Sequence, residues 1–336
     1  MMNRYARQML FNPIGEEGQQ KLADSSVLIV GAGALGGVIA NQLARAGLGK
    51  IRLIDRDYVE LTNLQRQILF DEQDVEKSVP KAIAAKNKLQ ASNSDIEVEA
   101  IVADATVDNI NDLIQGIDVV LDGTDNFSTR FMLNDICFKH GIPYSYGGVV
   151  SSRGMTSFFI PEQTPCLRCM ISEGAGDGQT CDTVGIISPI VDIISSYQVT
   201  ETIKYLTGHF KNLRQTFKTI DIWSNQQFDI KLAQPKKECL TCQQHIYPAL
   251  KKTMNEEATI LCGRDTVQIH KKSEMNLVKW KERLETIANV TRTPFLLKAQ
   301  FDNNIDFVIF SDGRVLVQGT EDIVKARTLY DRYIGS

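Results

Sequence analysis

A glycine-rich turn between an apolar run and a helical pattern constrains the fold of this chain most strongly. Residues 26–30 form an apolar run typical of a buried strand, and residues 38–46 have the pattern of a helix. Between them, Gly31, Gly33 and Gly36 have the spacing G-x-G-x-x-G. This spacing lets backbone N–H groups approach a phosphate at a helix N-terminus. The turn therefore predicts a nucleotide-binding α/β fold.

The pattern of strands and helices continues along the chain. Further strands are expected at residues 51–54, 96–102 and 117–121, and a helix at 80–90. The later elements are strands at 144–150 and 155–160, a long helix at 186–206, and a hairpin of residues 216–223 and 227–232. This order predicts a Rossmann-like, doubly wound, mostly parallel sheet extended by antiparallel strands.

A Lys- and Glu-bearing stretch after Pro248 suggests a linker between two domains. We expect a nucleotide-binding domain at 1–248 and a small C-terminal α/β domain at 258–336, with a hairpin at 307–316 and a final helix at 321–333. A cysteine at position 262 could suggest a sulfur-donating rhodanese domain. Only 74 residues follow it, so we reject that interpretation.

Composition limits the classes of partner. Hydrophobic residues make up 43% of the 336 residues and the formal net charge is -4, which gives no reason to expect binding to nucleic acid or to an acidic membrane surface. The sequence has no apolar run of 18 residues, and its first residues lack the apolar core of a secretory signal. We expect a cytoplasmic protein.

Polar residues follow the second predicted strand. Asp55 ends that strand, where it can accept hydrogen bonds from a ribose. With the glycine turn alone, this favours an NAD-dependent oxidoreductase. Cleavage of ATP between its α- and β-phosphates instead needs cations that neutralise phosphate charge. Arg66 and Lys81 are cations that can meet this need. The polar residues Asp57, Asn63 and Gln67 lie in the same part of the sequence and complete the cluster.

A second polar segment, residues 122–126, follows the fourth predicted strand. Ligands of parallel sheets bind at this carboxyl edge. The carboxylate of Asp125, next to Asn126, can hold Mg²⁺ against phosphates. Any one of these charges taken singly is best read as a solvated surface residue, but together they predict an ATP site.

Five stretches of the sequence resemble the MoeB/ThiF/HesA family of adenylyltransferases and the adenylation domain of ubiquitin-activating enzymes. The resemblance covers about residues 1–248, and its stretches are Arg4-Tyr5-Ala6-Arg7-Gln8, the glycine turn, Asp55-Arg56-Asp57 with Asn63-Leu64-Gln65-Arg66-Gln67, Pro80-Lys81, and Thr124-Asp125-Asn126 with Arg130. The resemblance implies that Asp125 is the essential aspartate on the metal and phosphate side. It also implies that Asn63, Arg66, Gln67 and Lys81 contact the nucleotide. By resemblance alone, Arg7 reaches the partner subunit's site across a homodimer interface.

The implied reaction joins AMP from ATP to the C-terminal glycine carboxylate of a ubiquitin-like sulfur-carrier protein ending in Gly-Gly, and releases pyrophosphate. The small subunit of molybdopterin synthase is the favoured carrier, the thiazole sulfur carrier is the alternative, and a sulfur-donor protein is a further candidate partner. An NAD-dependent oxidoreductase would leave Arg66 and Lys81 without a role. A non-catalytic adaptor would have no need to keep Arg66, Lys81 and Asp125 together.

Four of the seven cysteines form two C-x-x-C pairs, Cys166 with Cys169 and Cys239 with Cys242. Four thiolates suit a tetrahedral Zn²⁺, and the alternative is two redox or unrelated pairs. The resemblance also places a structural zinc on these positions.

Two other cysteines need separate interpretations. Cys181 lies in a Gly-rich loop, where the resemblance allows a covalent link to the carrier or to sulfur. The alternative is an ordinary thiol, since reactivity needs a lowered pKa. Cys137 lies on an apolar helical face and is expected in the core.

Overall fold

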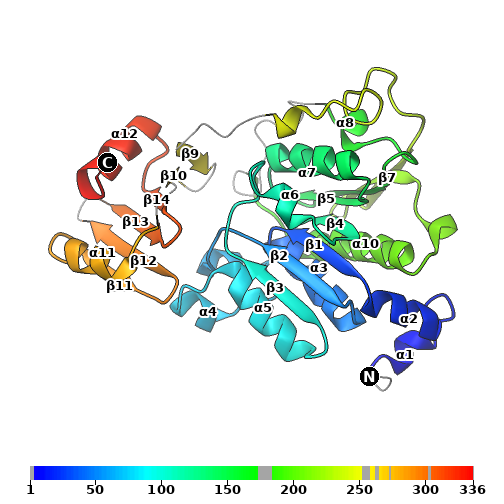
Figure 1. Cartoon of the computed structure of the whole chain (residues 1–336), viewed down its shortest axis with the longest axis horizontal. Helices are drawn as coiled ribbons and strands as arrows, with labels where there is room; N and C mark the ends of the chain where they lie inside the picture. Colours follow the sequence, from blue (N-terminus) through cyan, green and yellow to red (C-terminus); the bar gives the residue numbers. More distant parts are fainter. Residues whose placement is uncertain are drawn as a thin grey trace. The chain divides into compact units, whose positions relative to one another are not determined.

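The computed structural model describes residues 4–172, 184–251, 258–261, 265–271, 274–301 and 304–335. The chain divides into two compact units, one formed by residues 1–75 and 79–253 and the other mainly by residues 254–336 (Figure 1).

The first unit is built on an eight-stranded sheet. Its strands are β1 (Ser26–Val30), β2 (Lys50–Ile54), β3 (Glu97–Ile101), β4 (Val119–Asp122), β5 (Tyr144–Val150), β6 (Arg153–Phe159), β7 (Thr216–Asp221) and β8 (Gln226–Lys231). The order is β3-β2-β1-β4-β5-β6-β7-β8, with β1 to β5 parallel and β6 to β8 added in antiparallel fashion. The predicted fold class, a mostly parallel Rossmann-like sheet with an antiparallel extension, is confirmed.

Helices cover both faces of this sheet. The helices of this unit are α1 (Ala6–Met9), α2 (Gly15–Ala23), α3 (Ala34–Ala46), α4 (Glu72–Glu76), α5 (Lys81–Ser92), α6 (Ile110–Leu113), α7 (Phe127–His140), α8 (Leu167–Met170) and α10 (Ser188–Leu206). Figure 1 shows α6 and α7 above the sheet, and α3 and α10 below it.

The helix after the glycine turn begins earlier than the predicted residue 38. It starts at Ala34 and ends at Ala46, and the cap residue Gly47 has a φ of 82°, the left-handed geometry of a helix end. The first turn of α3 contains Gly36 and Gly37, which carry no side chain to show a helical period. The apolar pattern therefore becomes visible only from Val38.

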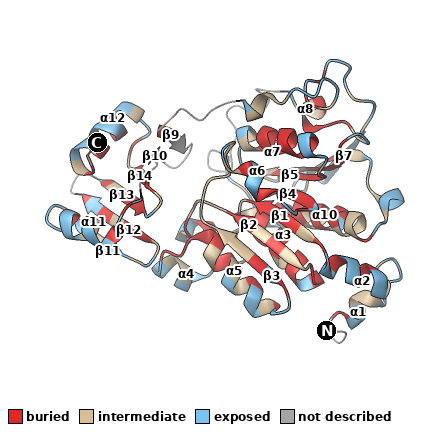
Figure 2. Cartoon of the chain, viewed as in Figure 1, coloured by how far each residue is buried: buried red, intermediate tan, exposed pale blue. Residues whose placement is uncertain are grey.

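One hydrophobic core of the first unit lies between the sheet and α7. It includes Leu28 and Val120 from the central strands, Tyr144 from β5, and Leu133 and Cys137 from α7. Figure 2 shows the central strands largely in the colour of buried residues. Cys137 is fully buried, which confirms its expected place in the core.

The second unit contains a six-stranded sheet whose neighbouring strands are all antiparallel. The elements are β9 (Ala258–Leu261), β10 (Thr266–His270), α11 (Leu277–Leu284), β11 (Asn289–Arg292), β12 (Leu296–Phe301), β13 (Ile305–Phe310), β14 (Arg314–Gln318) and α12 (Ile323–Tyr333). The predicted hairpin corresponds to β13 and β14, and the predicted final helix to α12. Leu284 of α11 and Tyr330 of α12 are buried in one core with Phe307 of the sheet.

Candidate nucleotide site and cysteine cluster

The glycine turn packs against the end of β4. Gly31 has a φ of 92°, and a Cβ on it would lie 2.7 Å from the carbonyl oxygen of Gly123. A Cβ on Gly36 would lie 1.8 Å from the carbonyl oxygen of Gly31. Gly33 differs, because its nearest neighbour would be the Gln67 Nε2 atom at 3.7 Å. The turn therefore excludes side chains where it meets β4, and has room at Gly33.

Asp55 fixes the turn to the end of β2. Its Oδ2 atom accepts a hydrogen bond from the Ala32 backbone N–H at 2.7 Å, and its Oδ1 atom accepts one from the Asp57 N–H at 2.7 Å. Burial raises the pKa of Asp55, while the charge of Lys81 opposes the shift. Each carboxylate oxygen can accept a further hydrogen bond, as from a ribose hydroxyl.

Lys81 is not a solvated surface charge, because only 3% of it is exposed. Its Nζ atom lies 3.2 Å from Asp57 Oδ2, and its backbone N–H donates to the Asp57 carbonyl at 2.8 Å. The pair joins the first residue of α5 to the segment after β2, on the side where Asp55 holds the glycine turn.

Asn63 and Gln67 are buried, with 4% and 5% exposed. The Asn63 Oδ1 atom accepts a hydrogen bond from the Glu60 N–H at 3.3 Å. Among the described residues, the Gln67 Oε1 atom has no hydrogen-bond partner, so it can accept one from a ligand. Arg66 is half-buried, and its Nη1 donates to the Thr62 carbonyl at 3.1 Å.

The end of β4 combines a buried and an exposed aspartate. Asp122 is fully buried, and it accepts hydrogen bonds from the Tyr144 hydroxyl and from the N–H and hydroxyl of Thr124. Burial raises the pKa of Asp122. Asp125 is exposed, and Asn126 caps α7 by accepting the Thr129 N–H at 2.8 Å. Asp122 thus shapes the segment and leaves Asp125 available to a ligand.

The N-terminal segment that carries Arg7 is anchored by its neighbours. The Tyr5 hydroxyl accepts a hydrogen bond from Asn93 Nδ2 at 2.7 Å, and Gln8 Nε2 donates to the Ala46 carbonyl at 2.9 Å. Arg7 itself is exposed on α1. The structure therefore fixes the backbone around Arg7, and its role across a dimer interface stays a prediction.

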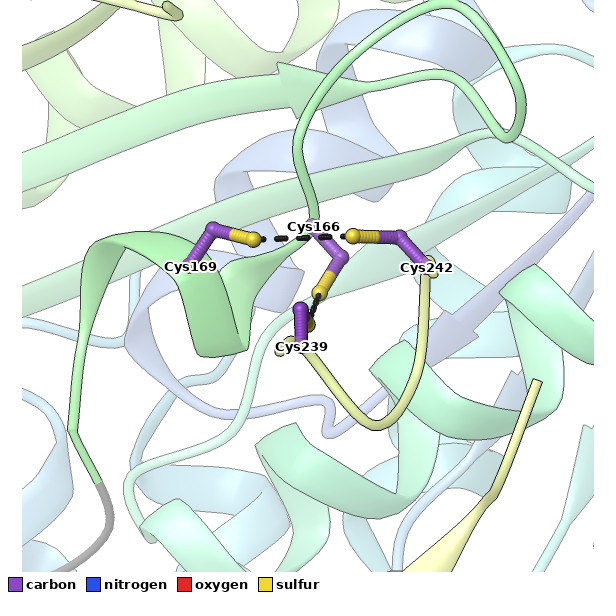
Figure 3. A group of neighbouring side chains, drawn as sticks. All are labelled: Cys166, Cys169, Cys239 and Cys242. Carbon is purple, nitrogen blue, oxygen red and sulfur yellow. Dashed lines mark hydrogen bonds between the residues drawn. The ribbon is translucent and has the colours of Figure 1, made fainter. Parts of the chain in front are cut away.

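The four paired cysteines meet in one cluster (Figure 3). All four Sγ atoms lie within 4.8 Å of one another, with 3.5 Å between Cys166 and Cys239 and 3.5 Å between Cys169 and Cys242. A tetrahedral Zn²⁺ with Zn–S bonds of about 2.3 Å needs sulfurs about 3.8 Å apart, close to this spacing. The facing sulfurs come from different C-x-x-C motifs, which argues against two separate redox pairs.

Hydrogen bonds within the cluster divide the four thiols into two kinds. Hydrogen bonds, the largest from Cys166, lower the pKa of Cys169 to about 6 and move the pKa of Cys239 below its ordinary value, whereas the pKa values of Cys166 and Cys242 are raised. The thiolate is the form that binds zinc. Cys181 and Cys262 lie outside the described residues.

The chain matches the ThiF family over residues 5–241. It belongs to the ThiF family. It is 42% identical, over the whole of both chains, to the sulfur carrier protein ThiS adenylyltransferase of Bacillus subtilis (strain 168). It is 38% identical over 206 residues to the protein of the same name from Escherichia coli (strain K12), covering 61% of this chain and 81% of that one. The crystal structure of E. coli MccB shares the fold, with a TM-score of 0.63 at 23% identity, covering 73% of this chain and 74% of that one.

The relatives of this ThiF-family chain are named adenylyltransferases, and we conclude that the chain is an enzyme of this class. The expectation from sequence is confirmed at this level, and the oxidoreductase alternative is set aside. No helix in the described part of the chain is long and apolar enough to cross a membrane.

Several residues that shape the two sites were not predicted from the sequence. Gly123 follows β4 directly, and its position after an apolar strand is a signal that could have been used. Tyr144 and Asp135 gave no such signal, because their partners lie on distant segments of the ThiF-family chain.

Proposed function

We propose that this protein uses ATP to adenylylate the C-terminal glycine carboxylate of a ubiquitin-like sulfur-carrier protein. The observation that carries the proposal is the contact between Gly31 and Gly123. Gly123 is only two positions before Asp125, whose carboxylate is exposed. The contact therefore places the glycine turn, whose backbone N–H groups can bind phosphates, next to the segment that carries this carboxylate. A single edge of the sheet can then hold the phosphates and the cation that they require.

In the proposed reaction, an oxygen of the carrier's terminal carboxylate attacks the α-phosphorus of ATP. A bond forms between that oxygen and phosphorus, the bond to the β-phosphate oxygen breaks, and pyrophosphate leaves with its electron pair. The attacking carboxylate is already ionised at neutral pH and needs no general base. Catalysis then consists of positioning and of charge stabilisation.

The assigned binding residues have distinct roles in this proposal. Asp55 accepts from the ribose, and Asn63 and Gln67 hold polar groups of the nucleotide. Arg66 and Lys81 neutralise charge on the phosphates.

Two metals fit the donors present. Asp125, an exposed carboxylate with Asn126 beside it, would hold Mg²⁺, which neutralises phosphate charge when bound. Cys166, Cys169, Cys239 and Cys242 would hold a structural Zn²⁺ with no open position for substrate.

Among carriers, we propose the ThiS class. The sequence alone favoured the small subunit of molybdopterin synthase. The full-length relative of B. subtilis, named for ThiS, supports the thiazole carrier instead.

Exchange of labelled pyrophosphate into ATP, dependent on the carrier, tests both parts of the proposal. We expect exchange with a ThiS-type carrier and at least tenfold less with a molybdopterin-type carrier. Exchange with neither carrier would contradict the adenylylation itself, and equal exchange with both would contradict only the choice of carrier.

We also propose that the active form is a homodimer in which Arg7 completes the site of the partner subunit. A two-fold interface presents the same patch from each partner, so both sites would be completed reciprocally. Arg7→Ala and Asp125→Asn homodimers should each be poorly active. After subunit exchange, each heterodimer has one intact site, and its activity should approach half of the wild-type value. Heterodimers that form but remain inactive would show that Arg7 does not act in trans.

A further inference from the structure

A buried carboxylate on α7 joins the two cysteine motifs. Asp135 is fully buried, and both of its oxygens accept hydrogen bonds from three segments besides its own helix neighbour. Among the described residues, Asp135 makes no hydrogen bond to those assigned to the nucleotide. A buried carboxylate is costly unless it is paired, so this arrangement must be held by its partners.

The first partner segment lies between Cys166 and Cys169. Arg168 donates two hydrogen bonds to Asp135, from Nε to Oδ1 at 3.1 Å and from Nη2 to Oδ2 at 2.9 Å. The backbone N–H of Leu167 donates to Asn134 Oδ1 at 2.8 Å. Both residues between the two cysteines are therefore fastened to consecutive residues of α7.

The second partner segment lies between Cys239 and Cys242. The hydroxyl of Thr241, which is fully buried, donates to Asp135 Oδ1 at 2.7 Å. A third segment follows this motif, where the Ala249 N–H donates to Asp135 Oδ2 at 2.9 Å. Arg168 and Thr241 thus share the Oδ1 atom of one carboxylate, which sets the spacing between the middles of the two motifs.

We infer that Asp135 is a positioning residue of the cysteine site, which holds the two C-x-x-C motifs so that their four sulfurs retain a zinc ion. The inference rests on the proposed zinc site. The carboxylate does not coordinate the metal itself, but fixes the backbone that carries the cysteine ligands. Groups in this position typically change metal affinity by about 10- to 100-fold when replaced.

The rate of zinc release to a chromogenic chelator tests this inference on the full chain. Asp135→Asn replaces a carboxylate oxygen with an amide NH₂, which cannot accept the hydrogen bonds that Arg168 and Ala249 donate. We therefore expect zinc release at least about tenfold faster than in the wild type. Thr241→Val removes a single hydroxyl and should accelerate release severalfold. Thr241→Ser restores the hydroxyl and should return release to within about twofold of the wild type.

Two control variants separate positioning from loss of stability. Asp112→Asn neutralises an exposed acid on α6, and Leu43→Ala opens a cavity in the fully buried part of α3. Both should release zinc at the wild-type rate. Cobalt(II) replacing zinc should show weaker thiolate charge-transfer absorption in Asp135→Asn than in either control.

Several outcomes would overturn the inference. One is wild-type release from Asp135→Asn or, if that variant fails to fold, from Thr241→Val. Another is acceleration by Leu43→Ala equal to that by Asp135→Asn. Absence of zinc from the wild-type protein would overturn it as well. None of these outcomes bears on carrier adenylylation, which the exchange assay measures separately.

Discussion

Two regions of the first unit position their functional groups in different ways. One is the proposed nucleotide edge, formed by the glycine turn and residues 122–126 after β4, and the other is the cysteine cluster. The nucleotide edge is built mainly from backbone, with glycines that remove side chains where the turn meets β4 and an exposed Asp125 at the strand end. The cysteine cluster is built from side chains of distant segments, which meet over α7 around a carboxylate with no exposed surface. A site that must admit a substrate is left open, whereas a site that must keep its ligand is closed.

The difference predicts how each region responds to mutation. At the open edge, exposed groups can be changed with little effect on folding and a large effect on chemistry. At the closed cluster, any change disturbs packing first. Four predictions test this contrast, in decreasing order of expected effect.

Asp125→Asn should lower ATP–pyrophosphate exchange by about 10²- to 10³-fold, because it removes charge stabilisation from the phosphate side. The melting temperature should stay near that of the wild type, since Asp125 is exposed. Asp112→Asn, which neutralises another exposed acid, should leave exchange unchanged. Exchange near the wild-type rate in Asp125→Asn would refute the metal role of this residue.

Cys239→Ser should reduce the zinc content from one ion per chain and lower the free energy of unfolding by more than about 4 kcal/mol, as expected for the loss of a structural metal. Elemental analysis of anaerobically purified protein and thermal unfolding measure these effects. Cys137→Ala also removes a buried thiol, but one outside the cluster, and should keep one zinc per chain. Wild-type protein without zinc would contradict this prediction.

Gly36→Ala and Gly33→Ala compare two glycines of the same turn. At Gly36 the new Cβ would meet backbone at 1.8 Å, so the turn must shift, with a loss of about 1–3 kcal/mol in unfolding free energy. At Gly33 the nearest atom is a side-chain nitrogen at 3.7 Å, and the loss should stay below about 1 kcal/mol. Chemical denaturation measures both, and equal losses would show that the turn is not limited by backbone contact.

Tyr144→Phe should give the smallest and most pH-dependent effect. Burial raises the pKa of Asp122, and the Tyr144 hydroxyl stabilises its charged form. The variant should lose about 0.5–1.5 kcal/mol of unfolding free energy at pH 7, because the N–H and hydroxyl of Thr124 still donate to the Asp122 carboxylate. This loss should shrink as the pH falls through the raised pKa of Asp122, because the protonated form needs the bond less. Tyr205→Phe removes a different tyrosine hydroxyl and serves as the control. If the free energy lost in Tyr144→Phe did not change with pH, the hydroxyl would not act on the charged form of Asp122.

Much of the nucleotide edge could be predicted because its signals are local. Strands, glycine spacing and the residues that follow each strand all lie within short windows, and parallel strands bring their carboxyl ends together. Even here the predicted start of α3 was four residues too late, because the glycines in its first turn have no side chains that could show the helical period.

The cluster was only half predictable. The spacing of Cys166 and Cys169, and of Cys239 and Cys242, predicted which four cysteines come together. Nothing in the sequence marked Asp135, since its hydrogen bonds join residues up to 114 positions apart. A buried polar group of this kind is defined by its three-dimensional neighbours alone.

The separation of the facing cysteines also sets an order of assembly. Each facing pair is 73 positions apart in the chain. The intervening segment contains α10, β7 and β8, which must be in place before the sulfurs can meet. The strand–helix–strand units around the glycine turn close much shorter loops, and loops of low sequence separation form first. We therefore expect the cysteine cluster, and the proposed zinc site with it, to form late in folding, after the strand–helix–strand units around the glycine turn.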